Sequence, residues 1–146
     1  MNHTRNFESF GLERGMEIVL IEVSTLLPHE EIKEKKLRKM IDLVKKRRGM
    51  HKPVLVDKET RTILDGHHRY NSALRLGLKF VPGIEVNYLE DDSIQVEPWP
   101  GKEEMEITKQ SVLSMAKSGN LYPPKTSKHS ISNEFPKQFF TIEELS

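Results

Sequence analysis

One stretch in the middle of the chain, residues 62–74, most constrains what this sequence can fold into. A short apolar run stops at Asp65-Gly66, and apolar residues then recur at helical spacing from Tyr70 to Leu74. This pattern predicts a strand, a tight glycine turn and the first turn of a helix. The N–H groups of a first helical turn have no partner within the helix, and the helix dipole adds positive potential there. The sequence therefore predicts an anion site at this corner.

The side chains around the predicted turn fit an anionic ligand. Gly66 allows the backbone to approach a phosphate closely, and Arg69 can bring a fork of N–H donors to it. Asp65 places a carboxylate at the lip of the same turn. A simpler interpretation stays open, because Asp-Gly is a common turn dipeptide. In that alternative Asp65 only caps the helix, and His67 and His68 are surface residues.

Size and composition indicate one soluble domain. The 146 residues are 36% hydrophobic and 31% charged, and no apolar run is long enough to cross a membrane. The absence of cysteine excludes disulfides, thiol nucleophiles and Cys-ligated metals. The N-terminus lacks the pattern of a secretory signal, so we expect a cytoplasmic protein. A net charge of +1 does not indicate a broad nucleic-acid interface, although residues 33–48 are locally basic.

The remaining patterns predict alternating strands and helices in a single domain over residues 16–146, after a flexible extension at 1–15. The first strand, 17–23, is almost continuously apolar, which favours a position inside the sheet. Pro82-Gly83 interrupts the strand at 80–88, which favours an edge position or a bulge. Gly49 is expected to end the helix at 33–48. The other expected elements are a hairpin at 53–64, helices at 67–77 and 107–118, and strands at 93–96 and 139–142.

Titratable residues follow the first strand directly. His29-Glu30-Glu31 stands where a cleft would form, but the two acids are equally suited to the N-terminus of the next helix. The lysines of that helix, residues 33–48, have two interpretations as well. They could contact a phosphate backbone or form an ordinary solvated face.

Two further segments carry polar or aromatic groups suited to a binding site. Trp99 lies between two prolines, which is compatible with a packed lid on the core and with a wall of a ligand pocket. The segment 125–129, Lys-Thr-Ser-Lys-His, supplies two cations, two hydroxyls and an imidazole. Such a group suits an oxyanion or a carboxylate, and a basic surface loop is the alternative.

These three motifs occur in one order: His29-Glu30-Glu31, Asp65-Gly-His-His-Arg69, and the late Lys125 to His129 segment. Together they resemble the ParB/sulfiredoxin superfamily, and within it the free serine kinases, over residues 16–142. The resemblance implies an α+β fold, a small mixed α/β sheet flanked by helices. Sulfiredoxins place a catalytic cysteine where this chain has His67. ParB proteins carry Gly-Glu-Arg-Arg at the corner and a helix-turn-helix domain afterwards, which is not evident here.

The resemblance also implies a reaction and a role for each matching residue. The reaction is phosphorylation of L-serine, or a similar small hydroxyl compound, to O-phospho-L-serine, with ATP or ADP as donor and Mg2+. Glu30 corresponds to the carboxylate base, and a slip of one residue would give Glu31 that role. Asp65 orients the hydroxyl or Mg2+. The implied phosphate-binding residues are Gly66, His67, His68 and Arg69, and the implied substrate-binding residues are Trp99, Lys125, Thr126, Ser127 and His129.

Two other functions remain as alternatives at this stage. A ParB-like nucleotide-binding or DNA-associated regulatory module is supported by the basic helix at 33–48, whereas the near-neutral net charge makes a nucleic-acid partner unlikely. A metal site built from His29, His67 and His68 is the other, and it lacks an obvious organised further ligand.

Overall fold

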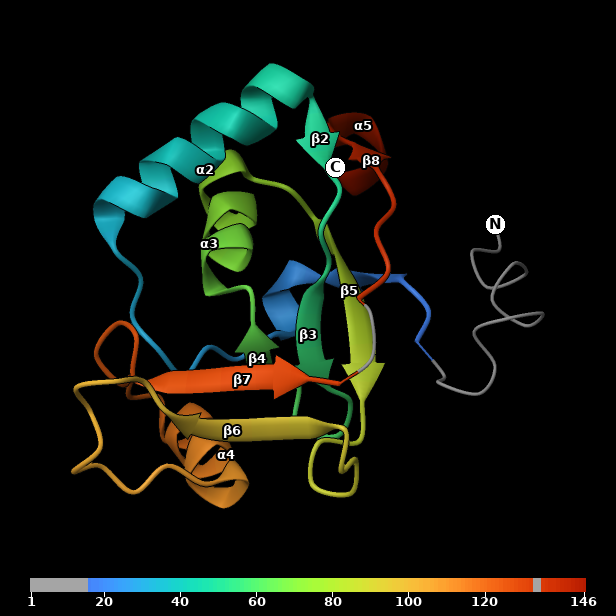
Figure 1. Cartoon of the computed structure of the whole chain (residues 1–146). Coiled ribbons are helices and arrows are strands. Elements are labelled where there is room, and N and C mark those ends of the chain that lie inside the picture. The colour runs from blue at the N-terminus through green and yellow to red at the C-terminus, as the bar shows by residue number, and fades with distance from the viewer. Residues whose placement is uncertain (1–15, 133–134) are drawn as a thin grey trace.

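A computed structural model describes residues 16–132 and 135–146 (Figure 1). The extension expected at residues 1–15 lies outside the described part. The main sheet has the strand order β1 (Val19–Glu22), β5 (Phe80–Val86), β3 (Val54–Asp57) and β4 (Ile63–Asp65). Strands β3 and β5 run parallel, and the other two pairs are antiparallel. The predicted fold class, a small mixed sheet flanked by helices, is confirmed.

The positions of β1 and β5 in this sheet are the reverse of the prediction. β1 forms an edge and β5 lies between two partners, so both expectations were wrong. A Cβ atom at Gly83 would fall on the Ile21 side chain of β1 and lie 3.2 Å from Val54 Cγ2 of β3. The glycine therefore permits close packing on both sides of a central strand, and it does not mark an edge.

Two helices lie beside the sheet, with α3 between α2 and the strands. Helix α2 (Glu34–Arg47) packs on α3 (His67–Leu76), which contacts β3 and β5. Arg48, with φ +61°, is the left-handed residue that ends α2, so the expectation for Gly49 was wrong. Gly49 instead starts β2, where a Cβ atom would collide with the backbone oxygen of Phe140. Close pairing of β2 with the C-terminal segment is what requires glycine at this position.

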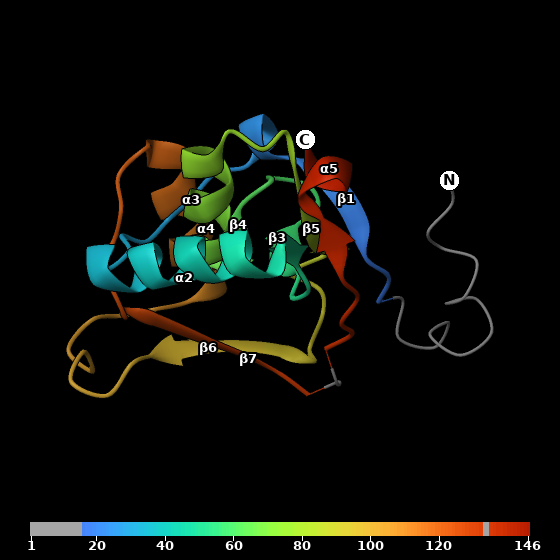
Figure 2. The same ribbon diagram turned by 90° about the horizontal axis from the view of Figure 1, so that it is seen from above.

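Two small antiparallel pairs complete the fold together with a third and a fourth helix. Strand β6 (Ile94–Pro98) pairs with β7 (Ser127–Ile131), so the second half of the predicted 125–129 loop is a strand. Strand β2 (Gly49–Met50) pairs with β8 (Phe140–Thr141). The remaining elements are η1 (Val23–Thr25), α4 (Lys109–Ser118) and α5 (Ile142–Leu145). In the view from above, α2 and the β6–β7 pair lie on the same side of α3 (Figure 2).

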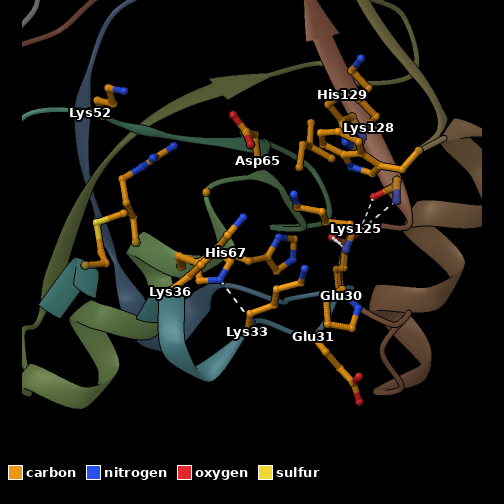
Figure 3. A pocket seen from close by; sticks show the side chains of 18 of the residues that line it. Glu30, Glu31, Lys33, Lys36, Lys52, Asp65, His67, Lys125, Lys128 and His129 are labelled. Carbon is orange, nitrogen blue, oxygen red and sulfur yellow. Dashed lines mark hydrogen bonds between the residues drawn. The ribbon is translucent and has the colours of Figure 1, made fainter. Parts of the chain in front are cut away.

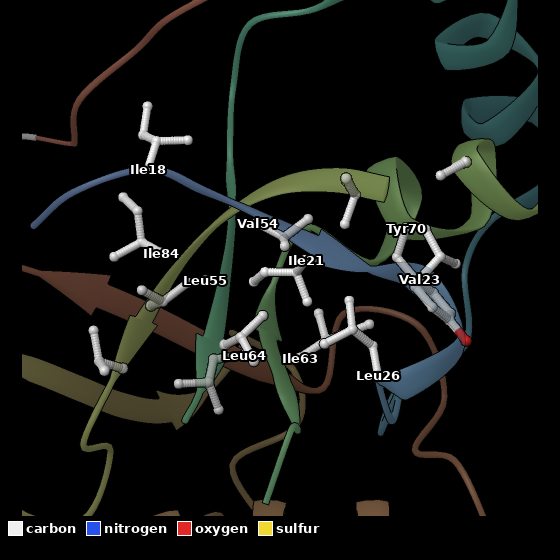
Figure 4. Close-up of a cluster of buried hydrophobic side chains, with 14 of the residues drawn as sticks. Ile18, Ile21, Val23, Leu26, Val54, Leu55, Ile63, Leu64, Tyr70 and Ile84 are labelled. Carbon is white, nitrogen blue, oxygen red and sulfur yellow. The ribbon is translucent and has the colours of Figure 1, made fainter. Parts of the chain in front are cut away.

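A single apolar core lies between the sheet and α3. Its fully buried members include Ile18, Val54, Ile63 and Ile84, and Tyr70 brings α3 onto them (Figure 4). Burial of side chains of this size is the main stabilising term of a domain like this one. No helix within residues 16–132 and 135–146 is long and apolar enough to cross a membrane.

Candidate functional site

A cavity of about 820 Å³ opens where the loop after β1, the start of α3 and the start of β7 meet (Figure 3). Among the described residues, eight cationic side chains and three carboxylates line it. The carboxylates are Glu30, Glu31 and Asp65, and the cations are Lys33, Lys36, Lys39, Lys52, Arg69, Lys125, Lys128 and Lys137. Cations outnumber acids so strongly that the cavity favours an anionic ligand of high charge.

The predicted strand–glycine–helix corner forms one wall of this cavity. Gly66 is the N-cap of α3 with φ +103°, and no side chain caps this helix end, so the interpretation of Asp65 as the cap was wrong. A Cβ atom at Gly66 would lie 2.8 Å from Val54 Cγ1 and 3.1 Å from Arg69 Nη2. Both the backbone angle and the close approach therefore require glycine here. The uncapped N–H groups of the first turn remain available to an anion in the cavity.

Arg69 reaches the same corner from the first turn of α3. Its Nη2 donates a hydrogen bond of 3.3 Å to the carbonyl oxygen of Pro53. Its Nε is buried and has no hydrogen-bond partner among the described residues. Burial lowers the pKa of Arg69, and the nearby Asp65 carboxylate partly offsets this effect. A buried guanidinium with an unused donor is costly unless a further acceptor completes its hydrogen bonds.

The two histidines after Gly66 use their rings inside the protein. The backbone N–H of His29 donates to Nε2 of His67 over 3.1 Å, and that of Lys33 donates to Nε2 of His68 over 3.2 Å. Burial lowers the pKa of both imidazoles, to well below the usual value for His67. The rings thus fix the loop after β1 against α3. Because Nε2 accepts in both rings, each neutral imidazole carries its proton on Nδ1, so these residues can offer an anion that N–H and their backbone N–H.

The same contacts contradict the metal site built from three histidines. Nδ1 of His29 lies 2.8 Å from the carbonyl oxygen of Ile63, and Nε2 lies 2.8 Å from Ser127 Oγ. Both ring nitrogens of His29 are therefore used in hydrogen bonds. Within the described part of the chain, no three His, Cys, Asp or Glu side chains are grouped to hold a metal ion.

Glu30 joins the loop after β1 to the late segment, as the order of motifs suggested. Its Oε2 accepts a hydrogen bond of 2.9 Å from the backbone N–H of Lys125. Its Oε1 accepts bonds of 3.0 Å and 2.8 Å from the N–H and the hydroxyl of Ser127. Glu31 is exposed, and its carboxylate points away from the other labelled side chains (Figure 3). Of the two acids, Glu30 is the one that the structure fixes beside the 125–127 backbone.

Trp99 is a wall of the cavity, which decides between its two predicted roles. Lys125 Nζ lies 5.3 Å and Lys128 Nζ 5.2 Å from the centre of its ring, both in cation–π contact. The backbone N–H of Trp99 donates to the carbonyl oxygen of Thr126 over 3.0 Å. The indole therefore positions two of the cavity's cations.

Of the two other residues of the late segment, only His129 lines the cavity. Thr126 is fully buried, and its hydroxyl donates to the carbonyl oxygen of Pro123 over 2.7 Å, so its assignment to substrate was wrong. It stabilises the turn that orients its neighbours. His129 does line the cavity, with its Nε2 at 2.8 Å from the Tyr88 hydroxyl. Burial lowers the pKa of His129 to about 3, which makes it a neutral ring at pH 7.

Sequence reasoning missed most of the cavity's lysines. Lys33, Lys36 and Lys39 recur every third residue and line the cavity from the start of α2. The ammonium groups of Lys36 and Lys125 lie close enough that Lys125 lowers the pKa of Lys36. The three-residue spacing was the available signal. It became meaningful only once the fold placed this end of α2 beside Lys125.

Proteins of similar sequence include L-serine kinases and a ParB-like protein. No protein-family model matches the chain. A ParB-like protein of Sulfolobus acidocaldarius is 38% identical over 74 residues, which are 51% of this chain and 36% of that protein. An ATP-dependent L-serine kinase of Staphylothermus marinus is 33% identical over 90 residues, 59% of this chain and 35% of the kinase. An ADP-dependent L-serine kinase, SerK, of Thermococcus kodakarensis is also 33% identical over 59% of this chain and 37% of its own length. The matches thus span little more than a third of these relatives.

Solved structures with the same fold include a free serine kinase and SbnI. A free serine kinase in complex with AMP superposes with a TM-score of 0.80 at 20% identity, covering 88% of this chain and 93% of the kinase chain. SbnI with a C-terminal truncation, from Staphylococcus aureus, gives 0.74 at 14% identity over 98% of this chain and 90% of the other. The fold of the chain is therefore that of the free serine kinases.

Proposed function

We propose that the chain is a nucleotide-dependent kinase that transfers a phosphoryl group to the hydroxyl of free L-serine. One observation carries the proposal: the Glu30 carboxylate, bound to the 125–127 backbone, lines the same cavity as the uncapped start of α3. A base and an anion site in one cavity are what phosphoryl transfer to an alcohol requires. Sequence relatives named as L-serine kinases support this choice.

The donor's phosphates fit the electropositive wall. The N–H groups at the start of α3 and the unused Nε of Arg69 would bind the phosphate oxygens, and Lys36 would add charge from α2. A second cavity of about 320 Å³ adjoins the first and shares Arg69 with it. Met40, Leu43, Val44 and Met50 are among its lining, so we assign the nucleobase to it. ATP and ADP both fit this description, and the named relatives use one or the other.

The acceptor fits the opposite wall, beside Glu30. A serine hydroxyl is a weak nucleophile at pH 7, and Glu30 would remove its proton as the oxygen attacks. Lys125 and Lys128, both held on Trp99, would bind the carboxylate of the amino acid. Asp65 is exposed at the lip of the cavity and suits Mg2+, which proteins often bind through one carboxylate together with substrate phosphates. The metal would neutralise charge on the phosphates.

The deciding experiment is incubation of the protein with Mg2+, L-serine and either ATP or ADP, followed by detection of O-phosphoserine. Glu30→Gln should lower turnover by about 10²–10⁴, the usual contribution of a general base. Glu31→Gln is the matched control and should keep activity, since its exposed carboxylate points away from the other labelled side chains of the cavity (Figure 3). Failure of both nucleotides to yield phosphoserine would refute the kinase, and full activity in Glu30→Gln would refute the assignment of the base.

A ParB-like binding module is the second candidate, because one relative carries that name. It predicts DNA retention that weakens steeply with salt. Lys33, Lys36 and Lys39 line the cavity, so these lysines of the basic helix already have a role in the kinase. Salt-sensitive DNA retention without phosphoserine formation would favour the regulatory module. A cytoplasmic location, where free serine and nucleotides occur together, is part of the kinase proposal.

A further inference from the structure

The Ser127 hydroxyl lies between two hydrogen-bond acceptors. Its oxygen is 2.8 Å from Glu30 Oε1 and 2.8 Å from His29 Nε2. The other ring nitrogen of His29, Nδ1, lies 2.8 Å from the carbonyl oxygen of Ile63. A carbonyl oxygen can only accept, so Nδ1 must carry the ring proton. His29 is completely buried, and burial lowers its pKa to about 4, so at pH 7 it has no second proton.

While Glu30 is ionised, the three hydrogen-bonded groups Glu30, Ser127 and His29 are therefore one proton short. Ser127 has a single hydroxyl proton, and both Glu30 Oε1 and His29 Nε2 need it. An ionised carboxylate is the stronger acceptor, so the proton points to Glu30 and Nε2 of the buried imidazole lacks a donor. When Glu30 becomes neutral, its oxygen accepts more weakly. The hydroxyl can then turn to His29 without any further proton being transferred.

We propose that His29 is a positioning residue that acts through the Ser127 hydroxyl to make Glu30 a stronger base. This inference rests on the proposed kinase function. In the reaction, the serine O–H bond breaks as its oxygen bonds to the terminal phosphorus and the bond from that phosphorus to the leaving nucleotide breaks. The proton goes to Glu30, and Ser127 rotates from Glu30 to His29. The second acceptor thus stabilises the protonated state that Glu30 must reach.

The surroundings of this network contain neutral rings and nearby cations. The groups that face His29 are His67 of α3, His129 of β7 and Tyr122, with ring centres 4.6, 5.9 and 6.2 Å away. His68 of α3 interacts electrostatically with Glu30, and the backbone N–H of Lys125 binds its carboxylate. Among the described residues, Ser127 is the side chain that hydrogen-bonds both His29 Nε2 and Glu30 Oε1, so it is their shared link.

The experiment is a carbon-13 NMR titration of the Glu30 carboxyl in the full chain, with its signal identified by its loss in Glu30→Gln. His29→Leu removes the second acceptor, so Glu30 should titrate about one pH unit lower than in the wild type. Ser127→Ala removes the shared hydroxyl and with it the link between His29 and Glu30. His29→Gln keeps an acceptor oxygen and should restore most of the wild-type value. In the Ser127→Ala background, His29→Leu should have no further effect.

A His29→Leu shift that disappears without the Ser127 hydroxyl is the result that a merely structural role would not give. An equal shift from His29→Leu with and without the Ser127 hydroxyl would overturn the proposal, and His29→Phe, which also lacks an acceptor, serves if His29→Leu fails to fold. Because the titration needs neither nucleotide nor turnover, it separates this network from the kinase activity. If O-phosphoserine forms, the acid limb of its pH–rate profile should move in the same direction as the titration. If the limb stays in place while the titration moves, the proposed effect on catalysis is wrong.

Discussion

Replacement of Gly66 by alanine tests the corner on which the anion site depends. Gly66 has φ +103°, and an added Cβ atom would lie 2.8 Å from Val54 Cγ1. The left-handed backbone costs a non-glycine residue about 1–2 kcal/mol. Forcing a methyl group into a packed contact adds about 1–3 kcal/mol. We therefore expect Gly66→Ala to lower the free energy of unfolding by about 2–5 kcal/mol, or the melting temperature by roughly 5–15 °C.

Gly77→Ala is the matched control for the backbone angle. Gly77 ends the same helix with φ +70°, and no atom lies within 4 Å of a Cβ atom built there. It shares the conformational cost and lacks the collision, so we expect a loss of about 1 kcal/mol. The difference between the two variants isolates the close approach of the backbone to Val54.

The two variants should also differ in nucleotide binding. Gly66→Ala displaces the first turn of α3 and the neighbouring Arg69, so the dissociation constant for ATP or ADP should rise at least tenfold. Gly77→Ala, at the far end of the helix, should bind as the wild type does. Urea denaturation followed by circular dichroism gives the stabilities, and titration calorimetry gives the affinities. Equal stability of the two variants would refute the packing argument, and unchanged affinity in Gly66→Ala would refute the phosphate assignment.

Two further predictions concern charge. Lys36→Ala should weaken nucleotide binding about fivefold, because it removes one exposed ion contact. Lys35 lies on the same helix and does not line the cavity, so Lys35→Ala should leave the affinity measured by calorimetry unchanged. His29 has its pKa lowered from 6.5 to about 4 in the folded chain, so the unfolded chain binds the extra proton between these values. The contribution of His29 to stability should thus be complete above pH 6.5 and fall by roughly 3 kcal/mol as the pH drops toward 4. Urea midpoints across this range should fall less steeply in His29→Gln.

Local signals in the sequence were sufficient for most helices and for the corner itself. The helices α2 and α3 lie within one or two residues of their predicted bounds, because their apolar spacing and end signals are local. The places of β1 and β5 in the sheet were reversed, because a strand's partners are chosen by distant segments. A run of apolar residues indicates that a strand is buried, and it does not show whether another strand or a helix covers it.

Single side chains of the site were harder to predict than the segments that carry them. His67, Thr126 and Ser127 all come from motifs that do reach the cavity region. Their polar atoms nevertheless bind His29, Pro123 and Glu30 within the protein. Residue type and spacing cannot tell a group that contacts a ligand from one that holds its neighbour, because both need the same donors and acceptors. The lysines of α2 show the reverse case, since an ordinary basic helix face became a cavity wall once α2 was placed.

The contacts of Glu30 limit how its substitutions can be interpreted. Lys125 has φ +56°, a conformation that is costly for a non-glycine residue, and the Glu30 carboxylate accepts the N–H of this same residue. Glu30→Ala would remove the base and also release the turn that carries Lys125, so a loss of activity would have two causes. Glu30→Gln keeps one acceptor oxygen for the Ser127 backbone and is the cleaner test. Adding Lys125→Gly, which relieves the backbone cost, should recover part of the stability lost in Glu30→Ala. Turnover should stay low, because the base is absent and Lys125 belongs to the proposed acceptor site.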